Sequence, residues 1–371
     1  MVLEVADAQE QAHASKHTFP CEQCGADLTF KPGDDQLVCP YCGHAQAIVV
    51  DGEVVEHDFK SALISARTAP ASAIVEGGHT IRCEGCGAET MIAGQSDHCA
   101  FCGSPVVVAV EESAALLVPD SVLPFKIDRR SAKEAFNTWV HKLWFAPGEL
   151  KKRAHTQGMD GVYIPYWTYD SETATRYRGE RGEHYYVNES YTDSEGKSQT
   201  RRVQKTRWHR TSGRIEVPFD DVLVCASETL PDKLIRKLWP WDLDDLKPYS
   251  AAFLSGFVTE QYKVDLEEGW KRAQLLMRPA IEAAIRRDIG GDEQRIASMD
   301  VRYAEITFKH CLLPLWISSF RFNDKVYRFV VNARSGKVSG ERPYSAGKIA
   351  ALVILILAVI GVIVFLATRG G

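Results

Sequence analysis

Eight cysteines in the first third of the chain are the residues whose type and spacing point most directly to chemistry. They form four Cys-x-x-Cys pairs, each followed by glycine, with 14 residues between the first two pairs and 12 between the second two. Two such pairs supply four sulfurs to one tetrahedral ion, the closed arrangement of a structural zinc site. Glycine permits the tight turn after each pair because it tolerates positive φ. The sequence therefore predicts two structural zinc ions, bound by Cys21, Cys24, Cys39 and Cys42 and by Cys83, Cys86, Cys99 and Cys102.

Three other chemistries compete for these cysteines. Disulfides form in oxidising compartments, and the start of the chain carries no apolar export signal. A redox pair of the thioredoxin type needs one Cys-x-x-Cys at a helix start rather than four in tandem. Iron in a rubredoxin-like site takes the same ligands, so ligand type alone leaves iron open. Spacing and glycines favour zinc, and zinc-bound cysteines indicate a reducing compartment.

The two cysteine sets also form an internal repeat. The sequence Cys-Glu-Gln-Cys-Gly-Ala at 21–26 resembles Cys-Glu-Gly-Cys-Gly-Ala at 83–88, and the later pair of each set contains an aromatic residue, Tyr41 or Phe101. Modules this small bury little apolar surface, so a bound metal must supply most of their folding free energy. The repeat predicts two zinc ribbons, with the bounds 19–50 and 81–110.

Outside the cysteine pairs, no residue pattern identifies a catalytic site. The chain lacks the metalloprotease, nucleophile-elbow and dinucleotide-binding motifs. Cys225 and Cys311 lie in apolar runs and are predicted to be buried core residues. His310 precedes Cys311 directly, and neighbours on a strand face opposite sides, so the two are not expected to form a dyad. The sequence therefore leaves open whether the chain is an enzyme, and the lack of a catalytic motif favours a protein that is not one.

A basic stretch at 201–214 is the strongest candidate for an interaction surface. A basic strand with an aromatic residue could bind phosphates and stack a base, or lie against anionic lipid headgroups. The favoured interpretation is a solvated hairpin whose cations face acids on the partner strand. The candidate phosphate or headgroup contacts are Arg201, Arg202, Lys205, Arg207, Trp208 and Arg210, and the balancing acids are Glu180, Glu183, Glu189, Asp193 and Glu195.

The rest of the 371-residue chain must position these groups, and it is long enough for two or three domains. A net charge of -5 gives no general attraction to nucleic acid. Residues 1–18 are predicted to be a disordered lead-in, and residues 51–80 and 111–123 are predicted linkers. Residues 124–344 mix helical and strand periodicities, which predicts an α+β domain rich in antiparallel strands.

Periodicity predicts the main elements of this domain. One helix is expected to begin at Asp128 or Ser131, and a second is expected from Asp265 to Ile289. Alternating aromatic and charged residues between them predict extended β-hairpins with a turn region at 188–197. The apolar stripe of the second helix is predicted to contain Trp270, Ala273, Leu276, Met277, Ile281 and Ile285. The closing strands are predicted near 301–309, 311–321 and 325–332.

Two proline-containing segments look like a second, weaker repeat. The sequence Tyr-Ile-Pro-Tyr-Trp at 163–167 resembles Leu-Leu-Pro-Leu-Trp at 312–316. Proline inside a strand indicates an edge or a bulge, so the two segments could pair across a pseudo-twofold axis. The alternative is two unrelated core strands that share a short pattern, and the sequence favours neither.

The C-terminal region carries 19 residues without a charge, at 349–367. As a helix this segment would span roughly 28 Å, close to the about 30 Å hydrocarbon core of a bilayer. A helix of a soluble domain normally shows a polar face, and this segment has none. We therefore expect a tail anchor in the cell membrane, crossing it once. The zinc-binding cysteines must stay reduced, and Arg342 and Lys348 precede the span. Both features predict that the N-terminal bulk lies in the cytoplasm.

Three further segments carry a family resemblance: Leu-Pro-Phe-Lys-Ile at 123–127, Gly-Val-Tyr-Ile-Pro-Tyr-Trp at 161–167 and Val-Val-Asn-Ala-Arg-Ser-Gly-Lys-Val at 330–338. With the tandem cysteine pairs, they make about residues 19–345 resemble bacterial membrane proteins with a zinc ribbon of the transcription-factor-IIB type, often labelled primosomal protein N′ (replication factor Y). A helicase would need a phosphate-binding loop. Gly336-Lys337 is followed by valine and lacks the upstream glycine, so we reject ATP-driven unwinding.

These features together predict a tail-anchored adaptor or scaffold. Its zinc ribbons would dock a cytosolic protein partner that the sequence does not identify. The alternative is a membrane-associated nucleic-acid-binding protein, related to replication but without helicase activity.

Overall fold

The computed structural model describes most of the chain. The predicted lead-in at 1–18 and parts of both predicted linkers lie outside the described residues, as do Asp193 and Glu195 of the basic hairpin. The described residues are 19–50, 52–68, 79–83, 85–92, 99–104, 107–109, 117–148, 158–192, 194, 196–322, 325–342 and 344–369.

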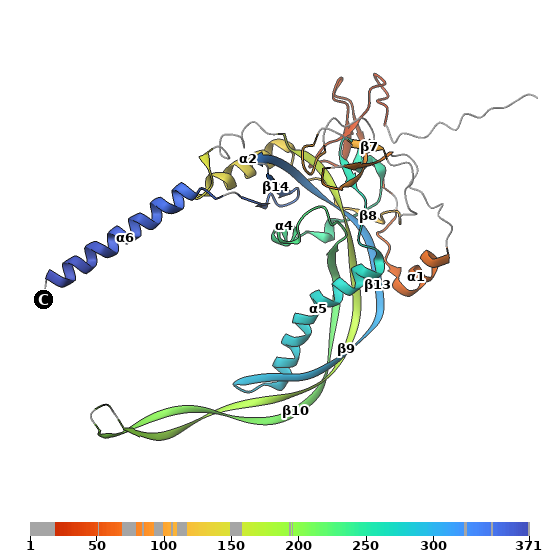
Figure 1. The fold of residues 1–371 in the computed structure, drawn as a ribbon. Helices are drawn as coiled ribbons and strands as arrows, with labels where there is room; N and C mark the ends of the chain where they lie inside the picture. The colour runs from red at the N-terminus through yellow and green to blue at the C-terminus, as the bar shows by residue number, and fades with distance from the viewer. Residues whose placement is uncertain are drawn as a thin grey trace, which may run out of the picture.

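The elements follow one another in two groups, and together they confirm an α+β fold (Figure 1). The N-terminal group contains β1 (Thr29–Phe30), β2 (Gln36–Val38), β3 (Ala45–Ala47), β4 (His57–Asp58), α1 (Phe59–Thr68), β5 (His79–Cys83), β6 (Glu89–Ile92) and β7 (Val107–Ala109). The second group contains β8 (Ser121–Val122), α2 (Arg129–His141), β9 (Asp160–Thr192), β10 (Ser198–Cys225), α4 (Asp232–Ile235), η1 (Arg236–Leu238), η2 (Leu243–Asp245), β11 (Lys247–Pro248), η3 (Ala251–Leu254), β12 (Val258–Glu260), α5 (Leu266–Ile289), β13 (Glu293–Phe322), β14 (Lys325–Asn332), β15 (Val338–Gly340) and α6 (Ala346–Arg369).

Three long antiparallel strands, β9, β10 and β13, form the arch that dominates the molecule (Figure 1). The predicted hairpin is confirmed as one continuous pair, β9 with β10, which turns between Thr192 and Ser198. The strands predicted separately near 301–309 and 311–321 are wrong, because they belong to the single strand β13. Register shifts at Ile296/Ser298 and Ala304/Thr307 let β13 follow the curved β9 without a break.

The helix α5 lies along the inner side of this arch. The Asp265 side chain accepts a hydrogen bond from the Glu268 N–H at its start, and Gly290 follows its end with φ 65°. Five members of the predicted apolar stripe are buried, but Leu276 is 42% exposed, so that part of the prediction is wrong. The helix turns about 100° per residue, which places Leu276 beside the stripe rather than on it.

The two proline segments pair with each other, as the interpretation with a pseudo-twofold axis predicts. They lie antiparallel in β9 and β13, with Pro165 opposite Leu312 and Pro314 opposite Tyr163. This is the register expected of a local pseudo-twofold axis.

Each proline lies where its strand changes neighbours on one side. Along β9 the neighbour changes from β12 to β10, and along β13 from β8 to β14. The carbonyl of Pro165 accepts from the Ala226 N–H at 2.9 Å, and that of Pro314 accepts from the Ala333 N–H at 3.2 Å. A proline, which has no N–H to donate, is tolerated in a strand where the ladder is interrupted in this way.

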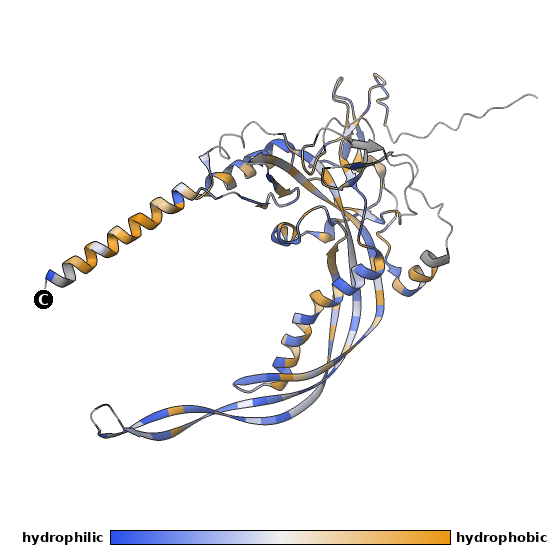
Figure 2. Ribbon diagram, in the orientation of Figure 1, coloured by the Kyte–Doolittle hydropathy of each residue, from blue (hydrophilic) through white to orange (hydrophobic). Residues whose placement is uncertain are grey.

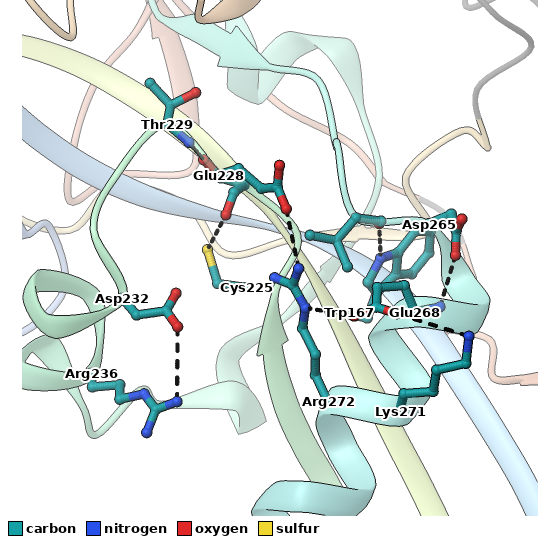
Figure 3. Close-up of polar contacts among 12 residues, drawn as sticks. Trp167, Cys225, Glu228, Thr229, Asp232, Arg236, Asp265, Glu268, Lys271 and Arg272 are labelled. Carbon is teal, nitrogen blue, oxygen red and sulfur yellow. Dashed lines mark hydrogen bonds and ion pairs between the residues drawn. The ribbon is translucent and has the colours of Figure 1, made fainter. Parts of the chain in front are cut away.

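The pseudo-twofold relation extends to the helices. The Trp167 indole donates to the Val264 carbonyl at 2.9 Å, and the Trp316 indole donates to the Ile127 carbonyl at 2.8 Å. Each acceptor residue directly precedes the aspartate that caps a helix, α5 in one case and α2 in the other. Figure 3 shows Trp167 beside Asp265 at the start of α5. The elements from β8 to β15, hereafter the body, therefore contain two related strand–helix units.

The helix α6 differs from every other described element in its surface. It projects away from the rest of the chain (Figure 1), and its surface is almost uniformly apolar (Figure 2). Its Ala346–Phe365 stretch is long and apolar enough to cross a membrane, and none of it is buried against the protein. An exposed helix of this composition would be unfavourable in water.

Candidate metal centres

Four backbone turns position the eight predicted ligands, and they share one hydrogen-bond pattern. In each turn the N–H of the first cysteine donates to the carbonyl five residues later, and the glycine N–H donates back to the first cysteine's carbonyl. The predicted positive φ is present at all four glycines: Gly25 (73°), Gly43 (75°), Gly87 (73°) and Gly103 (69°). A side chain would be strained in this region, which explains glycine at these positions.

The four turns bring the sulfurs together in two separate clusters of four. In the first cluster Cys21 lies 3.5 Å from Cys42, and Cys24 lies 3.5 Å from Cys39, measured between Sγ atoms. In the second cluster the corresponding pairs are 3.6 and 3.7 Å apart. A tetrahedral ion with metal–sulfur bonds of about 2.3 Å requires sulfurs about 3.8 Å apart. Both clusters therefore fit one tetrahedral metal ion each, whether zinc or iron.

The surroundings of the sulfurs favour thiolate in part of each cluster. The Cys42 N–H donates to the Cys39 sulfur and lowers the pKa of that thiol to about 6. In the second cluster, the hydrogen bond from Cys99 is the main cause that lowers the pKa of Cys86 to about 5. The pKa of the partner thiol Cys99 is raised, first by that hydrogen bond and then by burial. Thiolates as close as these repel one another. A divalent cation offsets that repulsion and lets four thiolates coexist.

The two clusters differ in how much of their surroundings reaches solvent. In the module of residues 19–50, hereafter the first module, Cys24 and Cys42 are exposed and the Tyr41 side chain is 83% exposed. In the module formed by β5, β6, β7 and 99–104, hereafter the second module, Cys102 is buried and the Phe101 side chain is fully buried. Equivalent positions of one sequence repeat therefore have opposite environments.

The second module is part of the main sheet. Its strand β6 pairs with β12, and the Gln261 N–H donates to the Glu89 carbonyl at 3.0 Å. Lys263 extends the contact by donating to the Gly87 carbonyl, next to the cysteine turn. Phe101 packs into the core cluster that contains Leu123 and Ile164. Body and second module thus share strands and a core.

The first module has its own three-stranded sheet, of β1, β2 and β3, and contacts the body along one side. The Phe30 N–H donates to the Ser255 carbonyl at 3.0 Å, and the Gly33 N–H donates to the Phe125 carbonyl at 2.9 Å. Phe30 packs edge-on against Phe253, with ring centroids 5.5 Å apart. A cavity of about 780 Å³ opens between this module and the start of α2. The first module therefore keeps its own sheet, while its buried Leu28, Phe30 and Leu37 belong to one core cluster with Phe125 and Trp316 of the body.

Sequence reasoning missed the buried charged groups of the body. Glu260 on β12 is buried beside the second module, where its carboxylate accepts from the Ser227 hydroxyl at 2.8 Å and from Thr229. Burial is the main cause that raises the pKa of Glu260 to about 7. No local pattern marks this residue, because both partners lie more than 30 positions earlier.

Two cations, the buried Lys309 and the partly buried Arg334, are held by acids that are distant in the sequence. Lys309 lies 2.8 Å from Asp221 and 3.0 Å from Glu56, measured from its Nζ. The nearby triad Asp170, Asp220 and Asp221 could reach one ion, but the Lys309 ammonium already compensates part of its charge. Arg334 donates three hydrogen bonds to Asp242 and further ones to Asp245 and the Pro124 carbonyl. Both ion pairs join segments that are far apart in the sequence, and their acid partners Glu56, Asp242 and Asp245 reach solvent.

Cys311 is buried in the strand core, as predicted, whereas Cys225 is only partly buried against the same core. Burial raises the pKa of both thiols, to about 12 for Cys225. A neutral buried thiol is inert.

The basic hairpin has many internal partners. Lys205 lies 2.7 Å from Glu189, and Arg201 lies 3.6 Å from the same carboxylate. Arg202 stacks over Tyr186 at 4.2 Å and Arg207 over Tyr185 at 5.0 Å, measured to the ring centroids. The Trp208 ring is covered by Arg295 at 3.7 Å. Arg210 lies opposite Glu180 in the ladder.

Near the base of the hairpin, α5 joins the segment after β10 through Arg272. This guanidinium lies 3.1 Å from Glu228 and 3.4 Å from Glu268 (Figure 3). The contact links the first turns of α5 to the end of the long hairpin, and it belongs to the scaffold rather than to a metal centre.

Comparison with known proteins gives one relative. Over 241 residues the chain is 29% identical to the uncharacterized protein YdjG of Bacillus subtilis strain 168. The aligned region covers 63% of this chain and 67% of that protein. No family model matches the chain. No solved structure matches it.

Proposed function

We propose that this chain is a membrane-anchored protein that carries two structural zinc ions, each in a zinc ribbon. Four sulfurs at tetrahedral spacing in each cluster support the metal, and the four glycine turns support the ribbon assignment. The bare apolar helix α6 supports the anchor. This architecture agrees with the resemblance to bacterial zinc-ribbon membrane proteins.

In this proposal the protein acts as an adaptor, and the first module is its docking head. The observation that supports this role is the 83% exposure of Tyr41 in a cysteine turn, whereas the equivalent Phe101 is buried. Exposed aromatic residues on a rigid turn are typical anchors of protein interfaces. The second module is then part of the body that carries the head, and α6 holds the whole assembly at the bilayer.

The proposed orientation places residues before α6 in the cytoplasm, with one crossing of the cell membrane. All ten cysteines are free, as a reducing compartment requires. Arg342 and Lys348 precede the span, in agreement with the positive-inside rule. Protease added to sealed inside-out vesicles should digest the N-terminal bulk. Protection in those vesicles would overturn the orientation.

Site-specific photo-crosslinking tests the docking head in native membranes. A photoreactive phenylalanine analogue at Tyr41 should form an adduct with a protein partner. The same analogue at Val55, which is exposed but lies outside the first module, is the matched control. No adduct at Tyr41 beyond that of the control would contradict the adaptor. Adducts with nucleic acid alone would favour the nucleic-acid-binding alternative, whose affinity should also fall steeply with salt.

A further inference from the structure

We propose that the corner where α2 ends and α6 begins is a second membrane contact, with Trp144 and Tyr344 placed in the headgroup interface of the bilayer. This inference rests on the proposed span of α6. It adds a surface of the body itself to the membrane contact, and it fixes the direction from which the body approaches the lipid.

Hydrogen bonds dock the start of α6 on the segment that follows α2. The Ser345 N–H donates to the Phe145 carbonyl at 2.8 Å. The Lys348 ammonium donates to the Ala146 carbonyl at 2.7 Å and to the Trp144 carbonyl at 3.3 Å. In Figure 1 the start of α6 accordingly lies beside α2. Body and helix are therefore joined by more than the connecting chain.

These contacts fix the depth of Trp144. Lys348 is the last charged residue before an apolar run that reaches Arg369. A lysine at the end of a span stays at the boundary between hydrocarbon and headgroups. Since the Trp144 carbonyl bonds directly to the Lys348 ammonium, Trp144 lies at the level of that boundary.

The exposed side chains of the corner suit that level. Trp144 is 79% exposed and stacks on Phe145, and Tyr344 is 58% exposed with the Arg342 guanidinium 5.3 Å from its ring. Tryptophan and tyrosine concentrate at membrane interfaces because they combine an apolar ring with a polar group. Arg342, Lys348 and the exposed Lys142 add positive charge for anionic headgroups. A lipid interface therefore fits this surface in both polarity and charge.

Fluorescence quenching in vesicles tests the contact with the full chain. The protein is reconstituted into phosphatidylcholine and phosphatidylglycerol vesicles, with and without lipids brominated near the headgroup end of an acyl chain. Bromine quenches only tryptophans at that depth. We expect a quenched component that is lost in Trp144→Phe. Trp239→Phe is the control, since Trp239 is also an exposed indole, 50% exposed, on a different element, and it should keep the quenched component.

The outcomes separate this inference from the span on which it rests. Protein that floats with the vesicles but keeps the same quenched component in Trp144→Phe would overturn the interfacial corner and leave the span intact. Protein that fails to float with the vesicles would overturn the span itself. Flotation together with selective loss of quenching in Trp144→Phe supports both.

Discussion

The first and second modules carry the same cysteine pattern and the same backbone turns, yet they relate to the body differently. Strand β6 of the second module belongs to the main sheet, and Phe101 is buried in the core that this module shares with the body. The first keeps a separate sheet and leaves Tyr41 in solvent. One copy of the repeated unit belongs to the main sheet, and the other keeps a separate sheet with an exposed aromatic residue, which we propose as the docking surface.

The two modules should differ most in how the loss of their metal ligands affects the stability of the body. Cys83→Ser with Cys86→Ser should remove one ion and unfold the body with the second module, because structural zinc sites of this kind contribute about 10–16 kcal/mol of apparent free energy. Cys21→Ser with Cys24→Ser is the matched variant, and it should remove one ion while the body stays folded. Hydrogen exchange of β9 and β13 measures the difference. Equal protection of these strands in both variants would contradict it.

A smaller effect is expected from the two aromatic residues of the cysteine turns. Phe101→Ala should lower the free energy of unfolding by about 3–5 kcal/mol, since a buried ring is replaced by a cavity. Tyr41→Ala should change it by no more than about 0.5 kcal/mol, since the ring is already in water. Urea unfolding of the zinc-loaded protein measures both. Similar losses for the two variants would show that the modules are equally buried.

Acid should destabilise the body through His310, which is fully enclosed beneath the strands. Burial lowers the pKa of this imidazole to about 4, below its ordinary value of 6.5. The folded state then binds fewer protons than the unfolded state, so stability is complete above pH 6.5 and falls as the pH drops toward 4. The loss attributable to His310 is about 3 kcal/mol. Urea unfolding at several pH values should show a shallower slope for His310→Gln, and an unchanged slope would refute the assignment.

The smallest effect is expected at the basic hairpin, which is remote from both modules. Lys205→Ala should change the free energy of unfolding by less than about 1 kcal/mol, because its ion pair with Glu189 is exposed to solvent. The loss should vanish at high salt. A salt-independent loss of several kcal/mol would mean that the hairpin is a stability element rather than a solvated arm.

Local chemistry explains which features the sequence could predict. The cysteine pairs, the glycine turns and the aspartate that caps α5 are all determined by residues within a few positions of one another. The long hairpin follows from alternation over many residues. The relation between the two proline segments was visible as a pattern, but only the strand register decided between pairing and coincidence.

Tertiary contacts explain what the sequence could not predict. Tyr41 and Phe101 occupy equivalent positions in one repeat, and nothing near them in the chain tells which one is buried. Lys309 bonds Glu56 from 253 residues away, so no window of sequence contains the pair. Periodicity predicts Leu276 as part of the apolar stripe, but it does not give the width of the surface that covers the helix, and Leu276 lies just outside that surface.

Removal of metal from the full chain by a chelator is the most direct test of whether the second module is an integral part of the body and the first module is not. Native mass spectrometry should first show two zinc ions per chain, then a species with one ion that accumulates while the body stays folded. In Cys21→Ser with Cys24→Ser the fast loss should disappear and the slow one remain, which assigns the retained ion to the second module. Simultaneous loss of both ions, or a folded chain without metal, would contradict the account.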